Sequence, residues 1–123
     1  MRATAHHVSF SVRDLARSRG FYEDLLGLAP KPRPDFGFPG AWYDAGACEV
    51  HLIEVPADFD AGRQPAALNP LAGHAAFAVE SYREAVGALR ARGLEMLEGG
   101  PELGQLWVRD PDGHIIELTA RGA

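Results

Sequence analysis

The 123-residue chain has 46% hydrophobic and 24% charged residues, which is typical of a single globular domain and excludes two full independent domains. No stretch approaches the roughly 20 consecutive apolar residues of a membrane span, so no membrane insertion is expected. The net charge of −5 argues against nucleic-acid binding, because neutralising phosphates requires a clustered basic face.

The cellular compartment is predicted from the N-terminus and the cysteine content. The opening MRATAHHVSF lacks the long apolar run of a secretory signal. Cys48 is the single cysteine, so no internal disulfide can form and nothing indicates an oxidising compartment. We therefore expect a cytoplasmic protein in which Cys48 is a buried thiol.

The first half of the chain predicts a β-α-β-β-β module over residues 5–55. Residues 7–12 alternate apolar with small or polar side chains, as a strand does. Asp14 offers an N-cap to an amphipathic helix through Leu26, and Gly27 stands where a helix C-cap is expected. The Pro-rich passage that follows predicts a loop. The remaining strands of this half are expected near residues 29–32, 41–45 and 49–55.

The second half repeats this pattern after a connector. Residues 56–72 contain three prolines and no sustained periodicity, which predicts a linker. The strand pattern restarts at His74, which lies 67 residues after His7, and Ser81 begins a capping box for a helix to about Arg92. Three more strands are expected at residues 94–98, 104–109 and 114–120. The prediction is one domain over residues 1–123, with modules 5–55 and 73–120.

Four ligand-type residues occupy equivalent positions in the two modules. Strand alternation places His7 and His74 opposite the apolar face of their strands. The last strand of each module carries His51 or Glu117. These two residues lie 66 residues apart, which is nearly the 67-residue separation of His7 and His74. A lone strand histidine is more often structural, but a buried, unpaired Glu117 would be costly. If a pseudo-two-fold axis relates the modules, the four converge on one divalent ion such as zinc, nickel, iron or manganese.

Strand alternation also places the other polar and aromatic residues, which are not predicted to be metal ligands. His6 is expected to face away from its neighbour and His114 away from Glu117, so both are predicted to be structural or exposed. Glu49 shares the face of His51 and is a reserve base, whereas Glu54 points away. The aromatic residues that could line a substrate pocket are Phe38, Trp42, Tyr43 and Trp107.

The most specific stretches of the chain are HHVSFSVRDLARSRGFYEDLLGL, GHAAFAV and DPDGHIIEL. They resemble the vicinal oxygen chelate superfamily, which includes glyoxalase I, bleomycin-resistance proteins, fosfomycin-resistance enzymes, methylmalonyl-CoA epimerase and extradiol dioxygenases. The resemblance implies an α+β fold in which two βαβββ modules form a curled mixed sheet around a metal cavity, often in a homodimer. The family's ligand positions match His7, His51, His74 and Glu117, although glyoxalase I has glutamate where this chain has His51.

The four-ligand pattern looks like that of glyoxalase I and the epimerases. It implies a divalent-metal-dependent lyase or isomerase that acts on a small carbonyl substrate through an enediolate, with Glu117 moving the proton. One alternative is a non-catalytic drug- or metabolite-binding resistance protein that works without metal. Another is an iron-dependent extradiol dioxygenase, which uses two histidines and one carboxylate and would tolerate the loss of His51.

Overall fold

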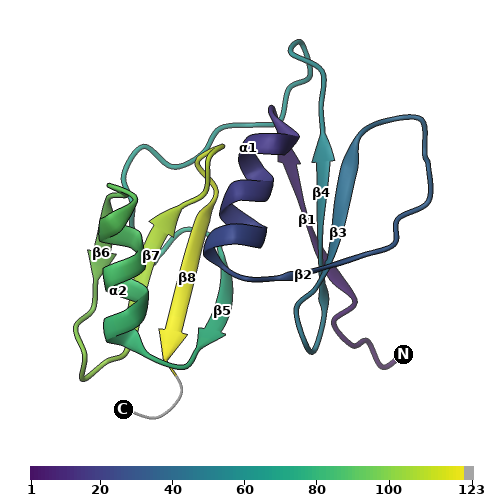
Figure 1. Cartoon of the computed structure of the whole chain (residues 1–123). Helices are drawn as coiled ribbons and strands as arrows, with labels where there is room; N and C mark the ends of the chain where they lie inside the picture. Colours follow the sequence, from purple (N-terminus) through teal and green to yellow (C-terminus); the bar gives the residue numbers. More distant parts are fainter. Residues whose placement is uncertain (121–123) are drawn as a thin grey trace. The chain divides into compact units, whose positions relative to one another are not determined.

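The computed structural model describes residues 1–120, which divide into two compact units (Figure 1). The first unit ends at Gly62 and the second begins at Arg63, inside the stretch 56–72 that the sequence predicts as a linker. Each unit holds one mixed four-stranded sheet. That the two units make up one domain stays a prediction.

The first unit follows the predicted βαβββ order. Its strands and helices are β1 (His7–Val12), α1 (Leu15–Arg19), a π-helical segment (Gly20–Leu25), β2 (Ala29–Lys31), β3 (Gly40–Asp44) and β4 (Glu49–Glu54). The sheet order is β1-β4-β3-β2, with β1 parallel to β4 and the other neighbours antiparallel. Since no tight turn can join parallel strands, the helix and two strands intervene between β1 and β4 in the chain.

Local signals in the sequence place the helix boundaries of this unit. The Asp14 carboxylate accepts a hydrogen bond from the Arg17 N–H at 3.2 Å, which caps the start of α1. Gly27 adopts a φ of 71°, the left-handed conformation with which helical segments commonly end. The helical region therefore spans nearly the whole predicted range.

An aromatic core lies between the helical region and the sheet of the first unit. The ring of Tyr22 stacks between those of Phe10 and Tyr43, at centroid distances of 5.8 and 6.5 Å. Both tyrosines are fully buried, as is Val12, whereas His7 is exposed. The predicted assignment of apolar residues to one face of β1 is confirmed.

The second unit repeats the architecture of the first. Its elements are β5 (Ala75–Val79), α2 (Tyr82–Ala91), β6 (Met96–Glu98), β7 (Gln105–Arg109) and β8 (Ile115–Ala120). The sheet order β5-β8-β7-β6 matches that of the first unit position for position, including the parallel pair β5 and β8. Ser81 caps α2 by accepting a hydrogen bond from the Glu84 N–H at 3.1 Å, as the capping box predicts.

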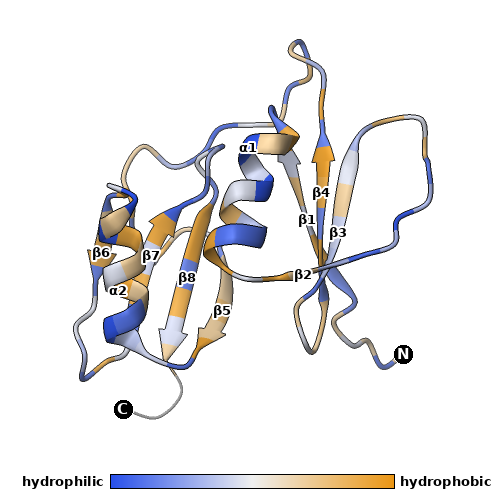
Figure 2. Cartoon of the chain, in the orientation of Figure 1, coloured by the Kyte–Doolittle hydropathy of each residue, from blue (hydrophilic) through white to orange (hydrophobic). Residues whose placement is uncertain are grey.

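The inner strands of both sheets carry the apolar residues. Hydrophobic residues stand along β4 in one unit and along β7 and β8 in the other, as the ribbon colours in Figure 2 show. In the first unit α1 packs on β4, and in the second α2 packs on β8 (Figure 1). Burial of these strands explains why they hold short apolar runs and few charges.

The predicted α+β class with two βαβββ modules and mixed sheets is confirmed. The curl of the sheets around a shared metal cavity involves both units and stays a prediction. No helix within residues 1–120 has the length and the apolar run that a membrane span requires.

Candidate functional site

His74 and Glu117 meet in the second unit. Glu117 lies in the middle of β8 and keeps only 8% of its surface exposed. His74 directly precedes β5, the strand that runs parallel to β8. Its Nε2 lies 3.0 Å from Oε1 of Glu117, and its Nδ1 lies 2.7 Å from the carbonyl oxygen of Ala72. The predicted pair of ligands is therefore in direct contact.

The hydrogen-bonding chemistry of this pair requires either a proton or a metal ion between the two facing atoms. The Ala72 carbonyl can only accept, so Nδ1 of His74 carries the hydrogen, and a neutral ring then presents a lone pair at Nε2. The ionised carboxylate of Glu117 also presents only lone pairs. Two such atoms 3.0 Å apart need a shared proton or metal ion. A backbone carbonyl on the far nitrogen is also how metal-ligating histidines are commonly oriented, so the pair fits a divalent ion.

Two side chains of β7 hold the Glu117 carboxylate. Trp107 donates its indole N–H to Oε1 at 3.1 Å, and Gln105 donates its amide N–H to Oε2 at 3.0 Å. These bonds offset the cost of burying the carboxylate and fix its orientation. The sequence indicated Trp107 only as a pocket residue and did not indicate Gln105. The sequence signal that could have identified both as partners of Glu117 is their spacing of two residues, which places them on one face of the strand next to β8.

The first unit brings His7 and His51 together. The ring of His51 lies between the rings of His7 and Trp42, at centroid distances of 4.0 and 4.5 Å and with an interplanar angle of 12° to each. Trp42 stands directly opposite His51 in the β3–β4 ladder, which explains the stacking. His51 is 8% exposed as a result. The indole therefore restricts the orientation of a candidate ligand.

Glu49 orients the same imidazole. Its Oε1 lies 2.9 Å from Nε2 of His51, and its Oε2 contacts the ammonium of Lys31. The hydrogen bond from His51, followed by that from Lys31, lowers the pKa of Glu49 to about 2. The ionised carboxylate can only accept, so Nε2 of His51 donates to Glu49, and Nδ1 is the ring nitrogen that Glu49 does not engage. Glu49, expected as a reserve base, is thus engaged by His51 and by Lys31, which the sequence did not indicate.

The four predicted ligands form two pairs, one in each unit. Within residues 1–120, no three His, Cys, Asp or Glu side chains form a group arranged to hold a metal ion. A complete site therefore requires the pairs to be combined, and their convergence on one ion stays a prediction.

Three other polar residues can be compared with their predicted roles. His6 was expected to face away from His7, but their Nδ1 atoms lie 2.8 Å apart. The expectation was wrong because His6 precedes the first residue of β1 and does not follow strand alternation. His114 contacts Gln64 at 3.1 Å and has a structural role, as expected. Glu54, expected to point away from His51, accepts a hydrogen bond from the Leu15 N–H at the start of α1 at 2.9 Å.

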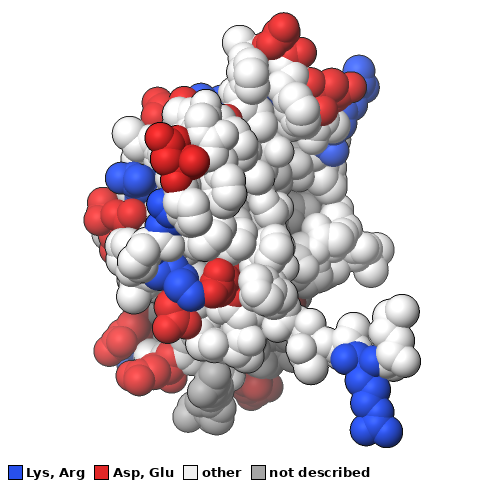
Figure 3. All heavy atoms as spheres, turned by 90° about the vertical axis from the view of Figure 1, so that its right-hand side faces the viewer, with Lys and Arg blue, Asp and Glu red and all other residues white. Residues whose placement is uncertain are grey.

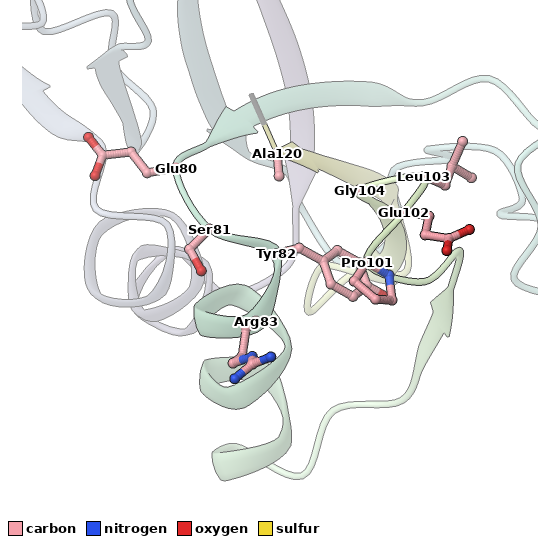
Figure 4. Close-up of a pocket in the computed structure, with 9 residues that line it drawn as sticks. All are labelled: Glu80, Ser81, Tyr82, Arg83, Pro101, Glu102, Leu103, Gly104 and Ala120. Atoms are coloured by element: carbon pink, nitrogen blue, oxygen red, sulfur yellow. The ribbon is translucent and has the colours of Figure 1, made fainter. Parts of the chain in front are cut away.

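A cavity of about 500 Å³ lies at the start of α2 in the second unit (Figure 4). Residues 81–83 form one side, and residues 101–104 form the other. The Tyr82 hydroxyl is engaged at this place, where it accepts a hydrogen bond from the Gly100 N–H at 3.0 Å. His74 and Glu117 do not line this cavity. It is therefore separate from the candidate ligand pair.

The charged side chains do not form a basic surface on the face that Figure 3 shows. Lys and Arg side chains there stand mostly among Asp and Glu side chains. This distribution agrees with the net charge of −5.

The repeated sheets and the paired ligand-type residues define the class of protein. The chain belongs to the Glyoxalase/Bleomycin resistance protein/Dioxygenase superfamily, whose model matches residues 4–118. The resemblance found in the sequence is thereby confirmed.

Known relatives are similar over nearly the whole chain. "Glyoxylase I 4" from Arabidopsis thaliana is 33% identical, over 92% of this chain and 68% of the relative. Lactoylglutathione lyase from Salmonella typhimurium is 30% identical, over 91% of this chain and 88% of the relative. The fold is also similar to the crystal structure of a glyoxalase/dioxygenase from Nostoc punctiforme. The two superpose with a TM-score of 0.77 over 97% of this chain and 91% of the Nostoc chain, at 23% sequence identity. That last likeness shows the fold.

Proposed function

We propose that the chain is a divalent-metal-dependent lyase or isomerase of the glyoxalase I type, which acts on a small carbonyl substrate through an enediolate. The relatives named as glyoxylase I and lactoylglutathione lyase support the reaction class. The contact between His74 and Glu117, which needs a shared proton or metal ion, is the observation that carries the proposal.

The proposed ligands are His7, His51, His74 and Glu117. Three imidazoles and one carboxylate suit one borderline divalent ion such as zinc, nickel, iron or manganese. When bound, the metal supplies the Lewis acidity that polarises the substrate carbonyl. Glu49 and the Ala72 carbonyl support this role, because each engages one nitrogen of a ligand histidine and leaves the other free to bind.

The proposed base is Glu117. In a substrate with a hydroxyl and a carbonyl on neighbouring carbons, its carboxylate, when it is not occupied as a ligand, takes the C–H proton from the hydroxyl-bearing carbon, and the electron pair of that bond moves through a new C=C bond onto the carbonyl oxygen as an enediolate. Glu117 then returns this proton to the former carbonyl carbon while the hydroxyl proton passes to the oxygen of that carbon, so that the hydroxyl and carbonyl groups exchange places and the reaction is an isomerisation. Trp107 and Gln105 keep the carboxylate in place during both transfers.

The proposed partners are a small-molecule substrate and a second copy of the chain. Members of the superfamily commonly act on small molecules and commonly form dimers. Sedimentation equilibrium of the purified chain tests the dimer, and a mass of one protomer at all concentrations contradicts it.

The proposed function is tested by elemental analysis of protein purified without chelators or nickel affinity resin. We expect about one divalent ion per protomer in the wild type and loss of it in His51→Ala and Glu117→Ala. His114→Ala is the matched control, because His114 lies outside the proposed ligand set. The metal-loaded protein is then assayed with hemithioacetals and with acyl-CoA epimers.

The outcomes separate the proposal from its alternatives. Absence of metal after reconstitution contradicts the proposal and favours a ligand-binding protein. Oxygen consumption with catechols that survives His51→Ala favours a dioxygenase. Loss of metal in His114→Ala to the same degree contradicts the ligand assignment.

A further inference from the structure

A cavity of about 660 Å³ opens in the first unit beside the loop that follows β2. Its lining combines cationic and aromatic groups. The charged residues and large aromatic residues that line it are Arg19, Lys31, Arg33, Asp35, Phe38 and Trp42. Three cationic residues and one acidic residue therefore line the cavity, in a chain whose net charge is −5.

The guanidinium of Arg33 is held firmly at this cavity. Its Nη1 donates to the carbonyl oxygen of Phe38 at 3.1 Å, and its Cζ lies 4.9 and 5.1 Å from the ring centroids of Phe36 and Phe38. A Cβ at Gly40 would lie 2.7 Å from Cζ and Nε of Arg33. Glycine at this position is what permits the close approach. Arg33 is thus part of a built site and not a freely moving surface side chain.

Arg33 also lacks an acidic partner among the described residues. Arg19 faces Glu23 at 3.9 Å, and Lys31 contacts Glu49. The neighbours of the Arg33 guanidinium are a carbonyl oxygen and two aromatic rings, and its Nε is buried without an acceptor. A half-buried cation without compensation attracts an anion more strongly than an ion-paired one does.

Aromatic rings connect the cavity with the candidate ligand His51. The ring of Trp42, which lines the cavity, stacks on His51 at 4.5 Å. The ring of Phe36 lies 5.9 Å from that of Trp42. A molecule whose carbonyl group reaches the candidate site can therefore extend along Trp42 toward Arg33.

We propose that this cavity binds a carboxylate group of the substrate, with Arg33 as the recognition group and with Phe38 and Trp42 packing against an apolar or planar part of the molecule. The planar guanidinium matches a carboxylate in its hydrogen-bonding geometry. One uncompensated cation suits a single negative charge better than the double charge of a phosphate monoester. The assignment of the occupant as substrate rests on the proposed function, whereas the anion site itself does not.

The binding test uses 3-phenylpropionate and its neutral amide, 3-phenylpropionamide, with the full chain. Binding is followed by NMR through the indole N–H of Trp42 and the Nε–H of Arg33. We expect the acid to bind more tightly than the amide. We expect Arg33→Gln to weaken binding of the acid about ten- to a hundredfold and to leave that of the amide nearly unchanged. Arg33→Lys, which keeps the charge but not the planar fork, should lie between the two.

Arg90→Gln is the matched control, because it removes the same charge from an exposed ion pair in the second unit. It should leave the preference for the acid intact. Equal binding of the acid and the amide by the wild type overturns the proposed carboxylate site. Unchanged binding of the acid by both Arg33 variants also overturns it, provided that their unfolding midpoints show that they are folded like the wild type.

The same variants separate this inference from the proposed function. A preference for the acid that depends on Arg33, in protein without metal or activity, supports the anion site and contradicts only the proposed function. For an active protein, we expect Arg33→Gln to raise KM for carboxylate-bearing carbonyl substrates and to leave kcat nearly unchanged. Equal effects on neutral and carboxylate substrates overturn the assignment and leave the proposed function in place.

Discussion

Trp107 lies directly opposite Glu117 in the β7–β8 ladder and donates its indole N–H to the Glu117 carboxylate at 3.1 Å. Trp42 holds the equivalent place opposite His51 in the β3–β4 ladder, where it stacks instead of donating. A tryptophan at the same position of each repeat thus supports a carboxylate through a hydrogen bond and an imidazole through ring contact. Both modules therefore place a tryptophan directly opposite a candidate ligand, and the type of contact differs with the ligand.

This relationship predicts unequal effects of two matched substitutions. Trp107→Phe keeps an aromatic ring but removes the hydrogen bond to Glu117, and we expect metal affinity or activity to fall about ten- to a hundredfold. Trp42→Phe keeps a ring that can stack on His51, so its effect should be smaller. Competition with a chromophoric chelator measures the affinities. Equal losses in the two variants contradict the positioning role of Trp107.

Tyr43 makes stability sensitive to alkaline pH. Burial, followed by the hydrogen bond to Glu23 and the negative charge of Glu23, raises the pKa of Tyr43 well above its usual value. A tyrosine in the unfolded chain ionises near pH 10, so this contribution to the free energy of unfolding is complete below about pH 10. It should decrease as the pH rises further, because the unfolded state then loses the proton more readily.

Urea unfolding of the wild type and Tyr43→Phe tests this effect. At neutral pH the variant should be less stable by about 1 kcal/mol, because the hydrogen bond to Glu23 is lost. Above about pH 10 the difference between the two proteins should shrink. A difference that stays constant across this range contradicts the assignment to Tyr43.

Local patterns in the sequence were sufficient to predict the modules. Alternation correctly separated His7 from the buried face of β1, and the capping residues Asp14 and Ser81 start the two main helices as predicted. Alternation failed at His6, which lies outside the strand. It applies only within a strand, so it cannot place residues that merely adjoin one.

The supporting residues of the candidate site could not be predicted in the same way. Gln105 and Trp107 contact the carboxylate of Glu117 on the neighbouring strand, and Lys31 on β2 reaches Glu49 on β4 across β3, because of particular strand registers. A one-residue change of register would turn each of these side chains to the other face, and local periodicity does not determine register between strands. The neighbours of Glu117 therefore became visible only in the structure.

Two glycines should respond in opposite ways to the same substitution. A Cβ at Gly40 would lie 2.5 Å from the backbone oxygen of Leu52 and 2.7 Å from Arg33, so Gly40→Ala should destabilise the fold by about 1–3 kcal/mol. Gly87 lies exposed within α2 with no atom near the position of a Cβ. Gly87→Ala should therefore stabilise by about 0.5–1 kcal/mol. Thermal unfolding measures both, and destabilisation by both substitutions contradicts the distinction.

Removal of metal should destabilise the wild-type protein more than it destabilises the Glu117→Gln variant. This substitution keeps the shape of the side chain but removes its charge. A ligand at about a hundred times its dissociation constant stabilises the folded state by about 2.7 kcal/mol, and a chelator abolishes that contribution. In the variant the facing atoms of residues 74 and 117 no longer present a negative charge to an ion. Thermal unfolding with and without EDTA should show a large shift for the wild type and little for the variant. An equal shift in both proteins would place the metal elsewhere, because a site that depends on the Glu117 charge cannot respond equally without it.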